Sequence, residues 1–269
     1  MLPFVRPFFL LCAAFLSSAP AAARDWYSAG YGQVTVRAFV VQEDEAAVRA
    51  LLPAPLTLAP AFEGREDGRH PLIVLFSTAT PKKAHLMQFL IDMTYQEFAV
   101  FIPHVRHPDI EGDLLHSLIL YLDSRPAVWM GRWPYRFPKI LAPVAQGEGT
   151  QFGQFDVLQE NRTRLVALEY TLDRDVPLAD LQPEIARLDR WMSLPLINGS
   201  RKFTCARMDW EIVNHSQVAR LDGTLAWQEQ WLADARRLPP PAGTLAGVKL
   251  ETLWHLSMPF DCDRLPTRH

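Results

Sequence analysis

Short segments with the residue pattern of β-strands make up most of this 269-residue chain. In residues 30–41 and in Arg164–Leu172 every second side chain is apolar, which predicts strands with one buried face. Further strand-like segments are residues 72–78, 86–102, 118–122, 127–130, 202–213, 218–227 and 248–259. Residues 43–52 and 178–192 instead have helical spacing. Because strands and helices do not alternate regularly, we predict a mainly β (α+β) single domain with mostly antiparallel strands.

Residues 1–23 have the pattern of a secretory signal peptide. Arg6 precedes an apolar run from Phe8 to Leu16, and small residues continue to Ala23. The run is too short to cross a bilayer as a helix, and the residues before Cys12 are not the small ones expected in a lipoprotein. We therefore expect cleavage near Ala23, an exported (periplasmic or secreted) domain of residues 24–269, and no membrane anchor.

The net charge of the chain is −3 at pH 7, which gives no electrostatic reason to expect nucleic acid or an anionic membrane as a partner. Cys205 and Cys262 remain after cleavage, and a disulfide between them is plausible in an oxidising compartment. The sequence leaves open whether their Cα atoms lie close enough. Two cysteines are too few for a zinc site built on cysteine pairs.

One cluster has residue types that suit a metal ion, and its members are His104, His107, Asp109 and His116. Two prolines bracket the first two histidines, so we expect this pair on a loop rather than on one face of a helix. We therefore favour ordinary loop histidines, and we expect neither a metal nor a cofactor.

Two other patterns also have simpler explanations. Asp209 and Glu211 are two residues apart on a predicted strand and face the same side, as paired glycosidase carboxylates do. Apart from Trp210 nothing nearby suggests a sugar site, so we favour a solvated strand face. The glycines of residues 147–153 lack the strand-to-helix transition of a phosphate-binding loop and predict a hairpin.

The segment Tyr121–Lys139 contains the residue that most suggests chemistry. We expect strands at residues 118–122 and 127–130, separated by a turn at 123–126. Lys139 follows, with the apolar residues Phe137 and Ile140 beside it. A lysine is ordinarily protonated at pH 7, but burial among apolar side chains favours the neutral amine, which is a nucleophile. A solvated loop lysine is the alternative interpretation.

The spacing of this segment resembles the signature of the acetoacetate decarboxylase family. The matching residues are Tyr121-Leu122-Asp123, Pro126-Ala127, Gly131-Arg132 and Phe137-Pro138-Lys139. The resemblance implies that Lys139 forms a Schiff base with a keto acid. It also implies that Glu97, in a Tyr-x-Glu pattern, lies near the lysine and orients the substrate or moves a proton. Arg132 is then a structural or carboxylate-orienting residue.

The resemblance covers nearly all of residues 24–269 and implies an antiparallel cone-shaped β-barrel with peripheral helices, assembled as a homo-oligomer. Three positions differ from the family pattern. Ile140 stands where the decarboxylase has a second lysine, and residues 72–76 lack the family's acidic residue. The family's first-strand arginine falls near Val34, with Arg37 the nearest arginine. Burial is thus the main local means of activating Lys139.

The expected function is that of a Schiff-base-forming lyase, and first of all a β-keto acid decarboxylase that binds a small keto acid or a similar carbonyl compound. An aldolase-dehydratase that uses the same lysine is a second hypothesis, because family members without the partners of the lysine carry out such reactions. A third is a non-catalytic exported β-barrel that binds a small apolar ligand.

Overall fold

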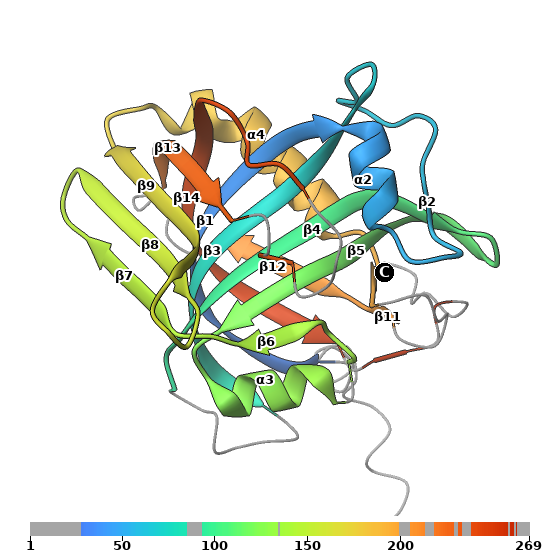
Figure 1. Cartoon of the computed structure of the whole chain (residues 1–269), viewed down its shortest axis with the longest axis horizontal. Coiled ribbons are helices and arrows are strands. Elements are labelled where there is room, and N and C mark those ends of the chain that lie inside the picture. Colours follow the sequence, from blue (N-terminus) through green and yellow to red (C-terminus); the bar gives the residue numbers. More distant parts are fainter. Residues whose placement is uncertain are drawn as a thin grey trace, which may run out of the picture.

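One sheet of fourteen strands forms the framework of the molecule (Figure 1). The computed structural model describes residues 28–84, 93–133, 135–198, 205–212, 218–228, 231–232, 238–257, 259–260 and 262. The predicted signal peptide, and parts of the predicted strands 86–102, 202–213 and 248–259, lie outside the described residues. Within the described part of the chain, no helix has the length and apolar character needed to cross a membrane.

Neighbouring strands are antiparallel except for β5, which pairs in parallel with β6 and β10. The main path through the sheet is β11-β10-β5-β4-β3-β1-β14-β13-β9-β8-β7, with β12 on β14, β2 on β4 and β6 on β5. The strands are β1 Ser28–Asp44, β2 Thr57–Leu58, β3 Arg69–Ala84, β4 Tyr95–His107, β5 Ile110–Leu122, β6 Lys139–Leu141, β7 Val144–Glu148, β8 Phe152–Leu158, β9 Arg164–Asp173, β10 Leu196–Ile197, β11 Cys205–Ala206, β12 Met208–Ile212, β13 Ala219–Trp227 and β14 Thr244–Ser257. The helices are α2 Glu45–Leu51, α3 Arg125–Arg132 and α4 Leu178–Met192.

These elements confirm a mainly β fold with few helices and mostly antiparallel pairing. The hairpin predicted around residues 147–153 is also confirmed, as β7 and β8. The pairing of the described strands follows an open path from β11 to β7. Closure into a cone-shaped barrel therefore stays a prediction.

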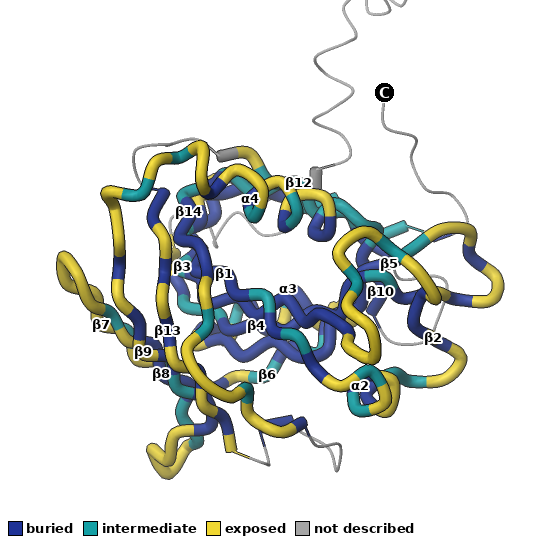
Figure 2. The backbone as a smooth tube through the Cα atoms, turned by 90° about the horizontal axis from the view of Figure 1, so that it is seen from above, coloured by how far each residue is buried: buried dark blue, intermediate teal, exposed yellow. Residues whose placement is uncertain are grey.

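The central strands are buried on both faces, as the largely dark tube of β1 and β4 shows in Figure 2. On β1, Val34 and Val36 belong to the core that contains the apolar side of α4. Phe39 and Val41 belong to a second core on the opposite face. The amphipathic helix predicted at residues 178–192 is confirmed, and its buried residues are Leu181, Ile185, Leu188, Trp191 and Met192.

The strand predicted at residues 127–130 is wrong, because these residues belong to helix α3. The Ser124 side chain accepts a hydrogen bond from the backbone N–H of Ala127 at 3.4 Å, which is the arrangement of an N-cap. Pro126 lies in the first turn, where its missing N–H costs no helical hydrogen bond. Of the apolar residues that suggested a strand, Ala127 and Val128 are buried on one side of this short helix, whereas Trp129 is exposed.

The loop predicted for His104 and His107 is also wrong, since both residues lie on β4. Pro103 is accommodated by an irregularity: the pairing of β4 with β5 changes register between Ile102 and Val105. His104 adopts a positive φ of 54° at this point. A bulge of this kind tolerates a proline because the local ladder hydrogen bonds are already interrupted.

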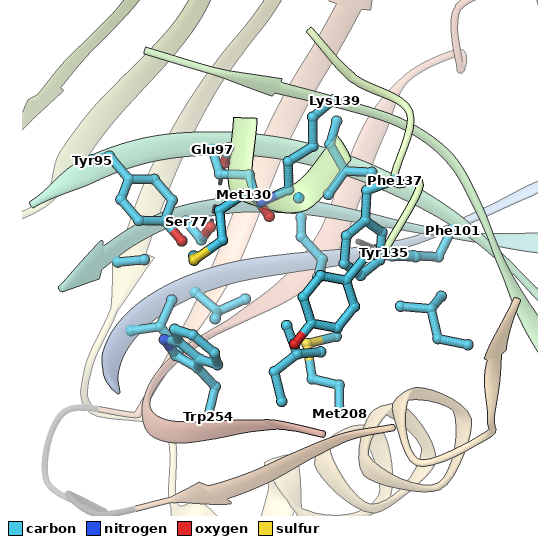
Figure 3. Close-up of a pocket in the computed structure, with 18 of the residues that line it drawn as sticks. Ser77, Tyr95, Glu97, Phe101, Met130, Tyr135, Phe137, Lys139, Met208 and Trp254 are labelled. Carbon is cyan, nitrogen blue, oxygen red and sulfur yellow. Dashed lines mark hydrogen bonds and ion pairs between the residues drawn. The ribbon is translucent and has the colours of Figure 1, made fainter. Parts of the chain in front are cut away.

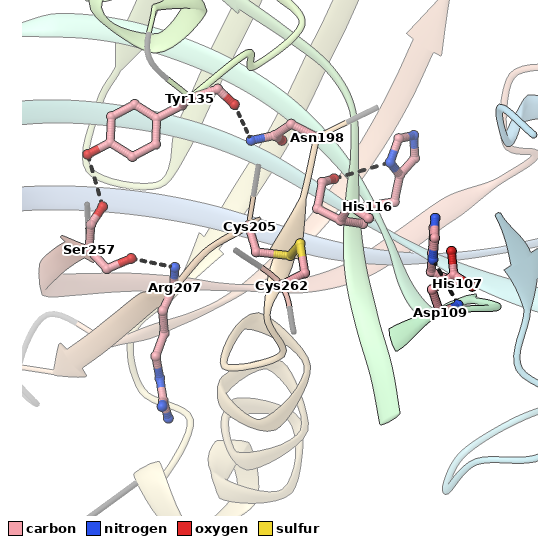
Figure 4. The surroundings of a disulfide bond; sticks show 10 residues. His107, Asp109, His116, Tyr135, Asn198, Cys205, Arg207, Ser257 and Cys262 are labelled. Atoms are coloured by element: carbon pink, nitrogen blue, oxygen red, sulfur yellow. Dashed lines mark hydrogen bonds between the residues drawn. A yellow bond between two sulfur atoms is a disulfide. The ribbon is translucent and has the colours of Figure 1, made fainter. Parts of the chain in front are cut away.

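A disulfide joins Cys205 on β11 to Cys262, with Cα atoms 5.1 Å apart, and so decides a pairing that the sequence left open (Figure 4). Both cysteines are buried. The backbones of Cys205 and Phe260 also exchange two hydrogen bonds. The bond therefore fixes the C-terminal segment against one end of the sheet path.

A cluster of polar residues attaches the hairpin β7–β8 to the centre of the sheet. Arg37 and Lys249 lie directly opposite each other on β1 and β14, an arrangement that is repulsive for two cations. Glu148 of β7 accepts hydrogen bonds from both, with Arg37 Nη2 at 2.5 Å. The Tyr170 hydroxyl donates to the same carboxylate at 2.6 Å. One carboxylate thus lies between the two cations and reduces their repulsion, and we call these four residues the Glu148 cluster.

The Glu148 cluster predicts a specific loss of stability in acid. Burial raises the pKa of Glu148, but the hydrogen bonds from Lys249 and Tyr170 and the charge of Arg37 outweigh it and hold the pKa at about 2, below the ordinary 4.5. This contribution to stability is complete above pH 4.5 and is lost as the pH falls towards 2. Urea unfolding of Glu148→Gln between pH 7 and pH 2 is expected to show lower stability at pH 7 and a shallower decline below pH 4.5.

The exposed Glu160 in the β8–β9 turn provides the control. Glu160→Gln is expected to keep both the stability at pH 7 and the acid profile of the unsubstituted protein. An acid profile of Glu148→Gln as steep as that of the Glu160 control would contradict the role of the cluster.

Candidate active site

A pocket opens on the α4 side of the sheet, bordered by strands β1, β3, β4, β5, β6, β12 and β14 and by helix α3 (Figure 3). About 100 Å³ of it is open to the centres of water-sized molecules. Its walls are largely aliphatic and aromatic. Among the described lining residues, Lys139 and Glu97 are the only ones with charged side chains.

Lys139 is placed by the short strand β6. Its Cα lies opposite that of Leu120 in the parallel pairing with β5. The Nε of Arg132 donates to the Lys139 carbonyl oxygen at 2.6 Å and so fixes the start of the strand. The side chain is buried, with 8% of the residue exposed, and its Nζ lies 5.6 Å from the centre of the Phe137 ring. An ammonium at this distance is stabilised by the ring face.

Gly131 of α3 leaves the space that the Lys139 side chain occupies. A Cβ at this position would lie 2.3 Å from Cδ and 2.4 Å from Cε of Lys139. These separations are far below van der Waals contact. Any other residue at 131 would therefore displace the lysine or shift the helix.

Glu97 reaches the same point from β4. Its Oε2 lies 3.5 Å from Lys139 Nζ, and the two side chains are 18% and 10% exposed. This distance is at the outer limit of a hydrogen bond. The pair is thus close enough to pass a proton after a small movement, but it is not a tightly formed ion pair.

Neutral polar groups complete the pocket. Burial, together with the nearby charge of Glu97, raises the pKa of Tyr95 far above its ordinary 10.0, so its hydroxyl is a neutral donor. Tyr135 is also kept neutral by burial, which raises its pKa, and its hydroxyl donates to the Ser257 carbonyl at 2.9 Å (Figure 4). The buried indole N–H of Trp254 finds no acceptor among the described residues.

The three residues expected at the site therefore lie in two places. Lys139 and Glu97 face each other in the pocket. Arg132 is exposed, is absent from the described pocket lining, and binds the backbone oxygen of Lys139. Its geometry is that of a residue that supports the loop and β6, and not of one that orients a substrate carboxylate.

Several pocket residues were not expected from the sequence. Tyr95 could have been found from its spacing, because residues 95 and 97 share a face of β4. Met208 and Trp210 line the pocket by the same alternation on β12. Asp209 and Glu211 consequently point away from the pocket, where Glu211 is exposed. The strand-face interpretation of these two acids is thus consistent with the structure.

The histidines considered for metal binding have separate partners. The described residues contain no group of three or more histidine, cysteine or acidic side chains that could hold a metal ion. The hydrogen-bond pairs are His104 Nδ1 with Asp113 Oδ2 at 2.7 Å, the backbone N–H of Asp109 with His107 Nδ1 at 3.1 Å, and His116 Nδ1 with the Ile197 oxygen at 3.3 Å.

With the geometry established, comparisons place the chain among known proteins. The family described as "Acetoacetate decarboxylase (ADC)" matches residues 18–259. The chain belongs to the acetoacetate decarboxylase family. A search of curated proteins finds no match. The recognition made from the Tyr121–Lys139 spacing is therefore confirmed.

Solved structures similar to this family member share its fold at low sequence identity. The enduracididine biosynthesis enzyme MppR, complexed with pyruvate, is 16% identical with a TM-score of 0.56, covering 84% of this chain and 86% of the other. Acetoacetate decarboxylase from Legionella pneumophila is 14% identical with a TM-score of 0.57 and 87% coverage of both chains. An acetoacetate decarboxylase-like enzyme from Sphingomonas wittichii RW1 is 14% identical with a TM-score of 0.53, covering 91% and 97%.

The position of Gly131 predicts that Gly131→Ala lowers the reactivity of Lys139 although alanine favours the helix by about 1 kcal/mol. Lys139 alkylation by acetaldehyde and cyanoborohydride, followed by peptide mass spectrometry, is expected to slow by about tenfold or more, equivalent to about 1.4 kcal/mol. The control is Arg125→Ala at an exposed position of the same helix, which is expected to leave the rate unchanged. Equal rates in the two variants would contradict this role of Gly131.

Proposed function

We propose that this protein is a Schiff-base-forming lyase in which Lys139 is the nucleophile and Glu97 the proton-transferring residue. The observation that carries the proposal is a buried lysine amine 3.5 Å from a carboxylate, inside a pocket with apolar walls. Family membership supports covalent lysine chemistry of this kind. The pyruvate bound by MppR supports a carbonyl compound as ligand for this fold.

The pair of charged groups suits the first step. Apolar surroundings disfavour the ammonium, whereas a nearby carboxylate favours it. A proton moved from Lys139 to Glu97 leaves a neutral amine beside a neutral acid, which is the pair of forms that nucleophilic attack needs. Because both forms of the pair have zero net charge, the transfer adds no net charge to the pocket.

The reaction then follows from the electron demand of the iminium. The Lys139 amine adds to the substrate carbonyl, and the protonated Glu97 supplies the proton with which the carbinolamine loses water. In the resulting iminium, the electrons of a bond β to the nitrogen move towards that nitrogen, and an enamine forms. After decarboxylation the Glu97 carboxylate takes up a proton from solvent, and after aldol cleavage it holds the proton of the β-hydroxyl group; in both cases it delivers that proton to the enamine carbon. Water then hydrolyses the iminium and releases the product and the free lysine.

Two leaving fragments are compatible with this sequence. Loss of carbon dioxide from a β-keto acid makes the protein a decarboxylase, whereas loss of an aldehyde from a β-hydroxy carbonyl compound makes it an aldolase. A dehydratase uses the same iminium: the Glu97 carboxylate removes a proton from the α-carbon to form the enamine, and the enamine then expels the β-hydroxyl group as water. The condensation product of pyruvate and imidazole 4-carboxaldehyde in complex with MppR supports the second outcome. Carbon dioxide release by the protein, measured with acetoacetate, distinguishes the two.

The reaction takes place outside the cytoplasm in this proposal. The pattern of residues 1–23 supports export, and the Cys205–Cys262 disulfide suits an oxidising compartment. Cell fractionation and the mass of the mature N-terminus test export. The mass of the intact protein before and after reduction tests the disulfide. A protein that keeps residues 1–23 in the cytoplasm would contradict export.

Lys139→Ala is expected to abolish covalent trapping. Borohydride added in the presence of acetoacetate, pyruvate or 4-phenylbutan-2-one is expected to leave a stable adduct on Lys139 of the unsubstituted protein, read by intact and peptide mass. The matched control is Lys82→Ala, which removes an exposed lysine and is expected to retain the adduct. The absence of any adduct in the folded protein would favour a non-catalytic binder of apolar ligands.

Glu97→Gln is expected to lower turnover strongly but still to allow the borohydride adduct on Lys139 to form. The amide keeps the size of the side chain but cannot transfer a proton, so turnover is expected to fall by about 10²–10⁴-fold. The borohydride adduct on Lys139 is expected to form still, at a reduced rate. Unchanged turnover in Glu97→Gln would remove Glu97 from the mechanism and leave Lys139 in place.

A further inference from the structure

The walls of the pocket are mostly apolar. Beyond Lys139 and Glu97, a bound molecule faces valines of β1, aromatic rings from β4 and β14, and the ring of Trp210 on β12. Val34 and Val36 are nearly buried, with 8% and 1% of each residue exposed. Such surfaces favour aliphatic and aromatic groups and disfavour a carboxylate that finds no cationic partner.

Three cations on elements that border the pocket, Arg37, Lys249 and Arg132, have other partners. Arg37 follows Val36 on β1 but faces the opposite core, where it is 2% exposed and bound to Glu148 and Tyr170. Lys249 donates to the same Glu148 carboxylate. Arg132 is exposed and holds the Lys139 backbone. In the part of the chain that the structure describes, Lys139 alone brings a cationic group to the pocket lining.

The charge balance of the covalent intermediate leads to the same conclusion. Condensation with a neutral ketone or aldehyde gives one iminium cation beside the Glu97 carboxylate, and the net charge of the pocket stays zero. A keto acid adds a second carboxylate next to Glu97, so two negative groups share one cation in apolar surroundings. Two carboxylates this close disfavour each other's charge, and the uncompensated one is expensive to bury.

We propose that the substrate of this site is an apolar ketone or aldehyde without a carboxylate group. The inference rests on the proposed Schiff-base function of Lys139 and adds its substrate class. The Tyr95 hydroxyl, an uncharged donor in the lining, suits a neutral oxygen of such a molecule. A substrate without a carboxylate has no carbon dioxide to release, so the iminium serves aldol or dehydration chemistry.

A matched pair of carbonyl compounds tests the proposal. 4-Phenylbutan-2-one and 2-oxo-4-phenylbutanoate differ only in a methyl group against a carboxylate beside the carbonyl. The rates at which cyanoborohydride traps each compound on Lys139 are measured at pH 7, and the rate for the ketone is divided by the rate for the keto acid. The same ratio is measured with butylamine in place of the protein. Dividing the first ratio by the second removes the intrinsic difference in electrophilicity between the two compounds. The corrected ratio is expected to favour the neutral ketone by about tenfold or more, equivalent to about 1.4 kcal/mol.

Val34→Arg supplies the missing cation at the pocket wall, and Val34→Met controls for the longer side chain. The arginine variant is expected to shift the corrected ratio towards the keto acid by about tenfold, whereas the methionine variant is expected to shift it little. Circular dichroism and thermal unfolding check that both variants fold. The ratio measured on the unsubstituted protein decides the question even if neither variant does.

The possible results distinguish a wrong substrate class from a wrong proposed function. A corrected ratio for the unsubstituted protein that favours 2-oxo-4-phenylbutanoate overturns the substrate class and leaves Schiff-base chemistry intact. Trapping of neither compound on Lys139 in a folded protein overturns the proposed function and with it the substrate class. Preferential trapping of 4-phenylbutan-2-one supports both.

Discussion

Along a strand, successive side chains point to opposite faces of the sheet. In this structure, that alternation decides which side chains enter the pocket and which enter the opposite core. On β1 it sends Val34 and Val36 into the pocket and Arg37 into the opposite core. On β6 it sends Lys139 into the pocket, while Ile140 packs against the larger core. A register shift of one residue would exchange these environments, exposing a buried arginine to the pocket and removing the lysine from it.

The charged groups on the two faces of the sheet are paired to different extents. In the Glu148 cluster, one carboxylate accepts hydrogen bonds from Arg37, Lys249 and Tyr170, so its charge is fully compensated. In the pocket, Lys139 and Glu97 are separated by 3.5 Å. A network in which every polar group is hydrogen-bonded rigidifies a core. A loosely paired lysine and carboxylate can still form hydrogen bonds with a ligand. The saturated cluster and the loosely paired lysine thus lie on opposite faces of the same sheet.

The parts of the fold that could be predicted from sequence are those governed by periodicity over many residues. The strand of residues 30–41 and the helix of residues 178–192 each have enough repeats to identify them. The hairpin near Gly149 was identified by its glycines instead. Helix α3 was missed because it has only eight residues, and the N-cap at Ser124 gave a better signal than its apolar content. The strand position of His104 was missed because a bulge accommodates the neighbouring proline.

The candidate site also has features that the sequence predicts and features that only the structure shows. The family spacing places a lysine near a glutamate, but sequence alone does not give the 3.5 Å distance or the position of Arg132 outside the pocket. Gly131 was part of the recognised spacing, yet its role depends on the path of the Lys139 side chain and appears only in three dimensions. Trp254 lies more than one hundred residues from the lysine, and no local pattern connects them.

Chemistry and specificity therefore come from different parts of the chain. Helix α3, Gly131, Arg132 and the Phe137 ring position Lys139, and all of them lie within the segment Tyr121–Lys139. The walls that select a substrate come from β1, β3, β12 and β14, which are distant in sequence. Substitutions on those strands can change the charge and size of the pocket without disturbing the lysine. If the proposed function holds, this family member keeps Lys139 and its local supports, while the walls from the distant strands suit a neutral carbonyl compound.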